Sequence, residues 1–162
     1  MKSNSSDVVL SPDIRYWIVT NVLIIAISFI ILTVSFYADN QYINLAGCVL
    51  SLSFLGLSFY RFVVLLTTKW IITEEQIKIY KGIFNRTINY IELYRVFDYE
   101  VKQNMILAAF HIKNIYIHSG DRSTPLLEMY GIHCKGVDYI SVIRDRVELQ
   151  KHKKSIYEFT NR

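Results

Sequence analysis

Two long stretches that carry almost no charge dominate the first third of the sequence. Residues 16–38 contain no Asp, Glu, Lys or Arg, and residues 45–66 contain only Arg61, close to the end of that stretch. A helix of about 20 apolar residues crosses the hydrocarbon core of a bilayer, which is roughly 30 Å thick. Only residues 39–44 separate the two stretches. The sequence therefore predicts two antiparallel membrane-spanning helices, a transmembrane hairpin over residues 16–67.

The beginning of the first helix argues against a cleaved signal peptide. Its apolar stretch is longer than the roughly 7–15 residues of a signal-peptide core, and no small-x-small cleavage pattern follows it at once. Immediately before it, Ser11-Pro12-Asp13 is typical of a helix start. We expect Ser11 to cap the helix, Pro12 to take its first position and Asp13 to lie at the positive end of the helix dipole.

Basic residues around the two stretches predict their orientation. Lys2 and Arg15 precede the first stretch, Arg61 and Lys69 mark the end of the second, and the connection carries Asp39 but no Lys or Arg. Because basic loops stay in the cytoplasm, we expect both termini and the rest of the chain on the cytoplasmic side of a bacterial cytoplasmic (inner) membrane. Aromatic side chains, which favour membrane interfaces, are expected at the cytoplasmic interface (Tyr16, Trp17, Tyr60 and Trp70) and at the opposite one (Phe36, Tyr37 and Tyr42).

Few polar residues interrupt the predicted spans. Arg61 is close enough to the end of its span for the side chain to reach the headgroups. Gly47 and Ser51 have the small-xxx-small spacing that lets two membrane helices approach closely, and Asn21 is expected to hydrogen-bond across the hairpin. Two spans without a buried acid–base pair are not expected to form a transporter within one chain.

After residue 68 the pattern changes to the alternation of apolar and polar residues that indicates half-buried strands. We expect strands over residues 70–72, 77–80, 86–91, 95–102, 113–119 and 125–132, with a helical turn over residues 104–110. From Val137, an apolar stripe at Ile140, Ile143 and Val147 predicts an amphipathic C-terminal helix. The sequence thus predicts an α+β fold, a curled antiparallel sheet of six or seven strands capped by a C-terminal helix, which is the shape of a pleckstrin-homology (PH) domain.

The predicted chain has four parts. These are a cytoplasmic N-terminal tail (residues 1–15), the transmembrane hairpin (16–67), the PH-like domain (68–150) and a basic C-terminal tail (151–162). Within the sheet, Phe97, Tyr99 and Val101 are expected to share one face of their strand because side chains alternate along a strand. A net charge of +4 is modest and lacks the dense basic stripe of nucleic-acid binders, so no nucleic acid partner is expected.

Residues 67–104, TTKWIITEEQIKIYKGIFNRTINYIELYRVFDYEVKQN, resemble the bacterial PH-domain membrane proteins of the second type, the YdbS/YdbT-like group. The shared pattern is a T-x-aromatic-x-I-T strand, a strand that ends in Gly, a basic R-T strand with an I-x-L-x-x-I continuation, and a V-x-V-x-Q strand. The matching residues are Thr68, Trp70, Ile72, Thr73, Gly82, Arg86, Thr87, Ile91, Leu93, Val96, Val101 and Gln103. Val96 replaces the last Ile, Tyr99 replaces the first Val, and LAAFHIKN at residues 107–114 replaces the usual L-G-x-G. The resemblance implies a PH-like domain, a preceding pair of membrane spans and no catalytic residues.

Candidate binding residues lie on the predicted strands. The first hairpin turn, residues 73–76, is acidic and would repel a polyphosphate headgroup. We expect lipid-headgroup contacts at Lys69, Lys78, Lys81 and Arg86, and protein-interface positions at three tyrosines predicted to point outward, Tyr80, Tyr116 and Tyr130. The four histidines are dispersed and no CxxC or HxxxH spacing occurs, so no metal site is expected. No nucleotide-binding or nucleophile motif occurs, so no catalytic residue, cofactor or small-molecule substrate is expected.

These observations lead to two functional hypotheses. The first is a non-catalytic membrane-anchored scaffold whose cytoplasmic PH-like domain binds protein partners or self-assembles at the membrane. The alternative is a membrane-active effector or pore subunit of a stress or defence system, with the PH-like domain as its sensor. Asn21 and Arg61 facing a common lumen in an oligomer would favour the alternative.

Overall fold

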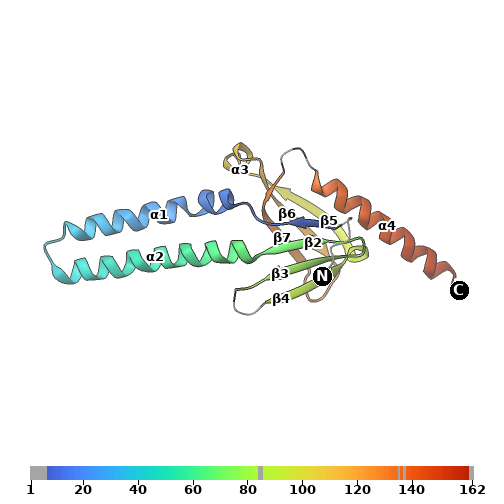
Figure 1. The fold of residues 1–162 in the computed structure, drawn as a ribbon, viewed down its shortest axis with the longest axis horizontal. Helices are drawn as coiled ribbons and strands as arrows, with labels where there is room; N and C mark the ends of the chain where they lie inside the picture. The colour runs from blue at the N-terminus through green and yellow to red at the C-terminus, as the bar shows by residue number, and fades with distance from the viewer. Residues whose placement is uncertain (1–6, 84–85, 135, 137, 161–162) are drawn as a thin grey trace.

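The computed structural model describes residues 7–83, 86–134, 136 and 138–160, and Figure 1 shows that they form two parts. Helices α1 (Ile14–Phe36) and α2 (Gln41–Thr67) lie side by side as a long hairpin that projects from one end of a β-rich domain. Both helices are long and apolar enough to cross a membrane. The predicted fold class, a membrane helical hairpin followed by a PH-like domain, is confirmed.

The hairpin buries its small and polar side chains and exposes its large apolar ones. The residues buried between the helices are Asn21, Ser28 and Ser35 in α1, and Gly47, Ser51, Ser58 and Leu65 in α2. Spacings of seven residues, such as that from Ser28 to Ser35, keep one helix face against its partner over many turns. Leucine, isoleucine and phenylalanine side chains point away from the partner, with Leu23 at 73% exposure. Such a surface is unfavourable in water and suits lipid.

Hydrogen bonds and a close approach join the two helices. The Ser51 hydroxyl donates to the Ser28 carbonyl at 3.0 Å, and the Ser35 hydroxyl donates to the Asn44 carbonyl at 2.8 Å. A Cβ atom on Gly47 would collide with the Ser35 side chain. The expected close approach at Gly47 and Ser51 is therefore confirmed, and it lets the serine hydroxyls reach backbone oxygens of the other helix.

Asn21 does not make the predicted bond across the hairpin. Its side-chain amide donates to the Trp17 carbonyl of the same helix at 3.0 Å and to the Thr20 hydroxyl at 3.1 Å. The link between the helices at this level comes from the Trp17 indole N–H, which donates to the Ser58 carbonyl at 3.0 Å.

The described residues of the domain form two antiparallel sheets. The first has the order β1 (Val8–Leu10), β2 (Lys69–Ile72), β3 (Gln76–Lys81) and β4 (Thr87–Glu92), and the second has the order β5 (Val96–Lys102), β6 (Ile112–Ser119) and β7 (Leu126–His133). A short 3-10 helix, η1 (Leu93–Arg95), joins the sheets, and α3 (Met105–Ala109) lies between β5 and β6. Helix α4 (Tyr139–Thr160) lies at the end of the domain away from the hairpin (Figure 1).

The inner faces of both sheets and one face of α4 enclose a single apolar core. Strand alternation turns the large apolar side chains inward, among them Trp70, Ile72, Ile77, Ile91, Ile115, Ile117, Leu127 and Met129. Helix α4 adds Ile143 and Val147, two members of the predicted stripe. The Arg146 guanidinium donates to the Ile72 carbonyl at 2.7 Å, which fixes α4 against β2.

Strand β1 was not predicted. It lies within the residues assigned to an N-terminal tail, yet Val8 pairs with Ile72 and Leu10 with Trp70. Three residues are too few for alternation to be recognised in a sequence, and here the neighbouring strand β2 provides the hydrogen bonds. The chain thus joins the sheet before α1 begins. At the other end, α4 continues to Thr160, beyond residue 150 where a tail was expected.

The start of α1 also differs from the prediction. Asp13, and not Ser11, caps the helix, because its side chain accepts a hydrogen bond from the Arg15 backbone N–H at 2.8 Å. The Asp13 backbone N–H donates to the Gly131 carbonyl at 2.8 Å. This bond holds the chain beside β7 until Ile14, where the helix begins.

Two predicted side-chain positions are wrong. Trp70 is fully buried in the domain core and so does not lie at the membrane interface, because it occupies an inward position of β2. Phe97 is 66% exposed and does not share the inward face with Tyr99. A register shift between Val96 and Asp98 causes this difference, because an extra residue in a strand turns its side chain away from the regular face.

Candidate functional site

The hairpin is packed directly onto the domain. Helix α2 ends at Thr67 and β2 begins at Lys69, so only Thr68 separates the last turn of helix from the first strand. Thr68 is fully buried, its hydroxyl donates to the Val64 carbonyl at 2.8 Å, and its oxygen lies 3.2 Å from the Tyr130 hydroxyl. This short, hydrogen-bonded connection leaves the domain little freedom to swing relative to α2.

Helix α1 makes a second contact with the domain at β7. The rings of Tyr16 and Tyr130 have centroids 5.6 Å apart, and those of Tyr130 and Trp70 are 5.4 Å apart, edge to face. Gly131 has a φ of +70°, and a Cβ atom there would lie 2.8 Å from the Cβ and Cγ atoms of Tyr16. Glycine thus permits both the backbone conformation and the close approach of the Tyr16 ring.

A groove with a basic rim lies where α2 enters the domain. We call it the basic groove, and it is lined by residues that include Leu66, Lys69, Tyr80, Lys81, Arg86 and Ile88, around a volume of about 530 Å³. None of the described residues that line it is acidic. Three of the four predicted headgroup residues, Lys69, Lys81 and Arg86, are therefore brought together, and Lys78 is not among the lining residues.

The outer face of the first sheet continues from this groove. Strand register places Val9 beside Ile71, Ile71 beside Lys78, and Lys78 beside Tyr90, with Tyr80 beside Ile88 in the next row. We call these six residues the outer sheet face. Val9 is 55% exposed, Tyr90 48% and Ile88 42%, and the other three are partly buried. A row of apolar and aromatic side chains with one lysine is thus accessible on the domain surface.

The three predicted interface tyrosines do not form one surface. Tyr80 lies on the outer sheet face and lines the basic groove. Tyr130 is packed between Tyr16 and Trp70, so α1 covers much of the surface that was expected to be free. Tyr116 lies on β6, where the Lys102 ammonium group is 4.9 Å from its ring centroid.

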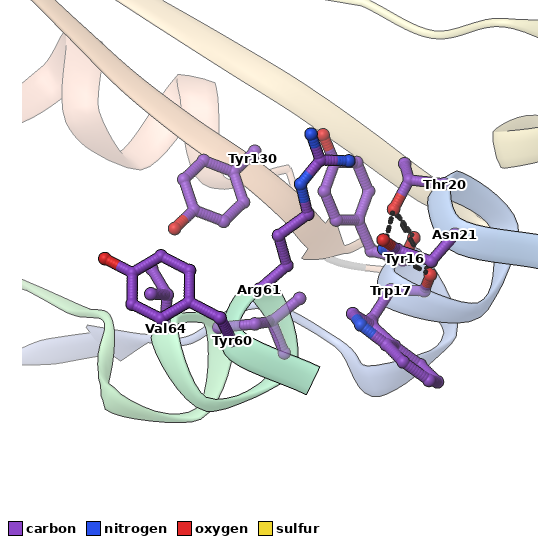
Figure 2. Close-up of a pocket in the computed structure, with 9 residues that line it drawn as sticks. Tyr16, Trp17, Thr20, Asn21, Tyr60, Arg61, Val64 and Tyr130 are labelled. Carbon is purple, nitrogen blue, oxygen red and sulfur yellow. Dashed lines mark hydrogen bonds between the residues drawn. The ribbon is translucent and has the colours of Figure 1, made fainter. Parts of the chain in front are cut away.

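A second cavity, shown in Figure 2, lies where α1, α2 and β7 meet. We call it the junction pocket, and its volume is about 370 Å³. It is lined by Tyr16, Trp17, Thr20 and Asn21 of α1, Tyr60, Arg61, Val64 and Leu65 of α2, and Tyr130 of β7. Figure 2 shows the Arg61 guanidinium extending toward Tyr130 and Tyr16. Asn21 and Arg61 are separate features of the sequence, and the pairing of the helices brings them to one pocket.

The junction pocket contains one charged group without a described ion-pair partner and one buried oxygen without a described hydrogen-bond donor. Arg61 is exposed, and none of the described ion pairs involves it. Asn21 is only 2% exposed, and its Oδ1 atom accepts no hydrogen bond from a described residue. A buried carbonyl oxygen without a donor is unfavourable, so the pocket favours a ligand that brings both negative charge and hydrogen-bond donors.

The described part of the chain contains no cluster of side chains suited to a metal ion, and its two cysteines are unpaired. The described residues include no group of three or more His, Cys, Asp or Glu side chains that could hold a metal ion. Cys48 and Cys134 are both free thiols. Burial raises the pKa of the Cys134 thiol, which keeps it protonated and weakly nucleophilic. His133 Nδ1, on β7, lies 3.6 Å from Asp13 Oδ2 at the start of α1.

Comparison with known proteins agrees with this architecture. The family model described as Bacterial PH domain matches residues 18–151, which include most of α1, all of α2, strands β2 to β7 and more than half of α4. No curated protein and no solved structure matches the chain. The resemblance inferred from residues 67–104 is confirmed, and the chain belongs to the bacterial PH domain family.

Proposed function

We propose that this protein is a non-catalytic, membrane-anchored scaffold. The hairpin holds the chain in the bacterial cytoplasmic membrane with both termini and the PH-like domain on the cytoplasmic side. The domain binds a protein partner, or a second copy of itself, through the outer sheet face. The observation that carries this proposal is the accessible apolar and aromatic surface formed by Val9, Ile88 and Tyr90, with Ile71 partly buried beside Val9.

An accessible sheet face of this kind suits a protein interface. The inner faces of the two sheets already share one core, so the outer sheet face is not needed to hold the domain together. Tyrosine is enriched in protein interfaces, and an apolar centre with charged residues at its edge is their usual composition. Anchoring by the hairpin raises the local concentration of partners in the same membrane, so a modest interface is sufficient.

The basic groove supports a second role for the same region, which is contact with membrane phosphates. Lys69, Lys81 and Arg86 lie beside the end of α2, and each cation near an anionic membrane contributes about 1 kcal/mol. Contacts of this kind orient the domain and do not recruit it, because the hairpin already fixes its location. Lys78 lies in the middle of the outer sheet face and is assigned to the protein interface.

Site-specific photocrosslinking in native membranes tests the interface. A photoreactive amino acid replaces Tyr90 in one variant and Val9 in another, with Ser123 in the β6–β7 connection as the matched exposed control. The proposal predicts a discrete crosslinked band from positions 90 and 9, either with a second protein or at twice the chain mass, and none from position 123. Equal yields from all three positions would refute the outer sheet face as the interface.

One observation favours the alternative, a membrane-active effector or pore subunit. Asn21 and Arg61, which would line a lumen, do share a cavity. That cavity lies where the two helices and β7 of a single chain meet. The serine hydroxyls of the hairpin bond to backbone oxygens of the same hairpin. Ion conductance of purified protein in planar bilayers distinguishes the two functions, because a scaffold gives no current above that of empty bilayers.

A further inference from the structure

The junction pocket lies at the depth in the bilayer where phospholipid headgroups begin. Counting about 20 residues from Leu45, where the apolar stretch begins, reaches Val64, so Arg61 lies within one turn of the boundary of the hydrocarbon core. On α1, Tyr16 and Trp17 lie in the first turn, at the same end of the hairpin. The phosphate of a phospholipid beside the hairpin is therefore within reach of the Arg61 side chain.

Arg61 has a positive charge for which the pocket provides no counter-charge. It is the one charged residue among the nine described residues that line the cavity. A cation beside hydrocarbon is costly unless it is paired, and the planar guanidinium group binds phosphate oxygens with two parallel hydrogen bonds. None of these nine residues is acidic, so no carboxylate offsets the repulsion between Arg61 and the cationic group of a zwitterionic headgroup.

The buried amide of Asn21 further restricts the class of ligand that suits the pocket. Its nitrogen is already used by the Trp17 carbonyl and the Thr20 hydroxyl, so the unpartnered oxygen can only accept. A headgroup that carries hydroxyls next to its phosphate supplies the missing donor. Trp17, Val64 and Leu65 form apolar walls suited to the glycerol backbone and the first carbons of an acyl chain.

We propose that the junction pocket binds one anionic, hydroxyl-bearing phospholipid, of which phosphatidylglycerol is the simplest example. The phosphate pairs with the Arg61 guanidinium. A small rotation of the Asn21 side chain, whose Oδ1 atom is buried, lets a headgroup hydroxyl donate to that oxygen. The volume of about 370 Å³ lies within the range of small-ligand sites, roughly 300–1,000 Å³. Because α1, α2 and β7 all line the pocket, a bound lipid also stabilises the contact between the hairpin and the domain.

Native mass spectrometry of the full-length protein released from detergent tests this site. Titration with phosphatidylglycerol is expected to give one tightly bound lipid, and phosphatidylcholine is expected to bind much more weakly. The variant Arg61→Gln should lose about tenfold or more in affinity for phosphatidylglycerol, because a hydrogen bond to a charged group is removed. Arg61→Lys should fall between the two, because lysine keeps the charge but not the paired geometry.

Two control variants show whether the tight lipid binds at the junction pocket. Arg122→Gln, the same substitution in the exposed β6–β7 connection, should bind lipid as the wild type does. The double variant Lys81→Gln/Arg86→Gln alters the basic groove and should also keep the tight lipid. Inorganic phosphate at millimolar concentration should not displace the lipid. Equal affinity of Arg61→Gln and wild type, loss of the tight lipid from the groove variant, equal binding of both lipids, or displacement by free phosphate would each overturn the proposal.

Discussion

Replacement of Gly131 by alanine should weaken the packing of α1 against β7 and lower the stability of the protein. Gly131 has a φ of +70°, where an alanine costs about 1–2 kcal/mol in backbone strain. The new Cβ would also lie 2.8 Å from the Cβ and Cγ atoms of Tyr16, close to the α1 backbone, where the side chain has little freedom to move away. Overpacking of this kind costs typically about 1–3 kcal/mol, so the free energy of unfolding should fall by about 2–5 kcal/mol in total.

Gly136→Ala is a matched control, because Gly136 has a similar φ of +79° but nothing within 4 Å of its ideal Cβ position. It should lose only the strain of about 1–2 kcal/mol. Thermal unfolding in detergent, followed by tryptophan fluorescence, measures both, and 1 kcal/mol corresponds to a shift of about 4–8 °C for a domain of this size. Adding Tyr16→Ala to each background isolates the contact. Equal losses in Gly131→Ala and Gly136→Ala would refute the packing of Tyr16 against β7.

Further predictions concern the hairpin, the pH response and the outer sheet face. Gly47→Ala should destabilise the helix pair in detergent because the new methyl group collides with Ser35. The control Gly56→Ala should not, because nothing lies within 4 Å of its Cβ position. An unchanged melting temperature of Gly47→Ala would contradict the close approach of the helices at Gly47. Burial raises the pKa of Tyr99 to about 12 from a normal value of 10. Tyr99 ionises at a lower pH in the unfolded chain than in the folded one, so the stability that its neutral form contributes is present below pH 10 and is lost as the pH rises toward 12. In the variant Tyr99→Phe, the free energy of unfolding should therefore fall less over this pH range. Tyr90→Asp should abolish crosslinking from position 9 without lowering the melting temperature, because Tyr90 lies outside the core; a parallel loss of stability would show that its role is structural.

The sequence was sufficient to predict the elements with long or regular patterns. The two spans follow from length and absence of charge, and β3 and β6 follow from strict alternation of residues such as Ile77 and Ile79. These signals are local, so they need no knowledge of the neighbouring elements. The same holds for the C-terminal helix, whose predicted stripe supplies Ile143 and Val147 to the core.

Features that depend on a distant partner were missed. Strand β1 has three residues and exists because β2, some 60 positions along the chain, pairs with it. Asp13 replaces Ser11 as the cap because Gly131 holds the preceding backbone, and Phe97 points outward because of a register shift against β6. No local pattern encodes these contacts.

Among the candidate sites too, one follows from a local sequence pattern and the other depends on contacts between distant residues. Charge and strand position predicted headgroup contacts at Lys69, Lys81 and Arg86, and these residues lie together in the basic groove. Their contact with lipid headgroups stays a prediction. The junction pocket required knowing which faces of the two spans pack together, since Asn21 and Arg61 lie 40 residues apart. One signal was available in advance: Asn21, Ser28 and Ser35 recur at seven-residue spacing and mark the buried face of α1.

Membrane topology is the property on which the scaffold, the basic groove and the lipid pocket all depend. In a chain with Cys48→Ser and Cys134→Ser, single cysteines are introduced as Tyr42→Cys in the first turn of α2 or Ser123→Cys in the domain. A membrane-impermeant maleimide applied to intact spheroplasts should label the Tyr42→Cys chain at once, and the Ser123→Cys chain only after lysis. Labelling of Ser123→Cys in intact spheroplasts, or of both positions from the same side, would contradict a hairpin that spans the membrane and holds its domain in the cytoplasm.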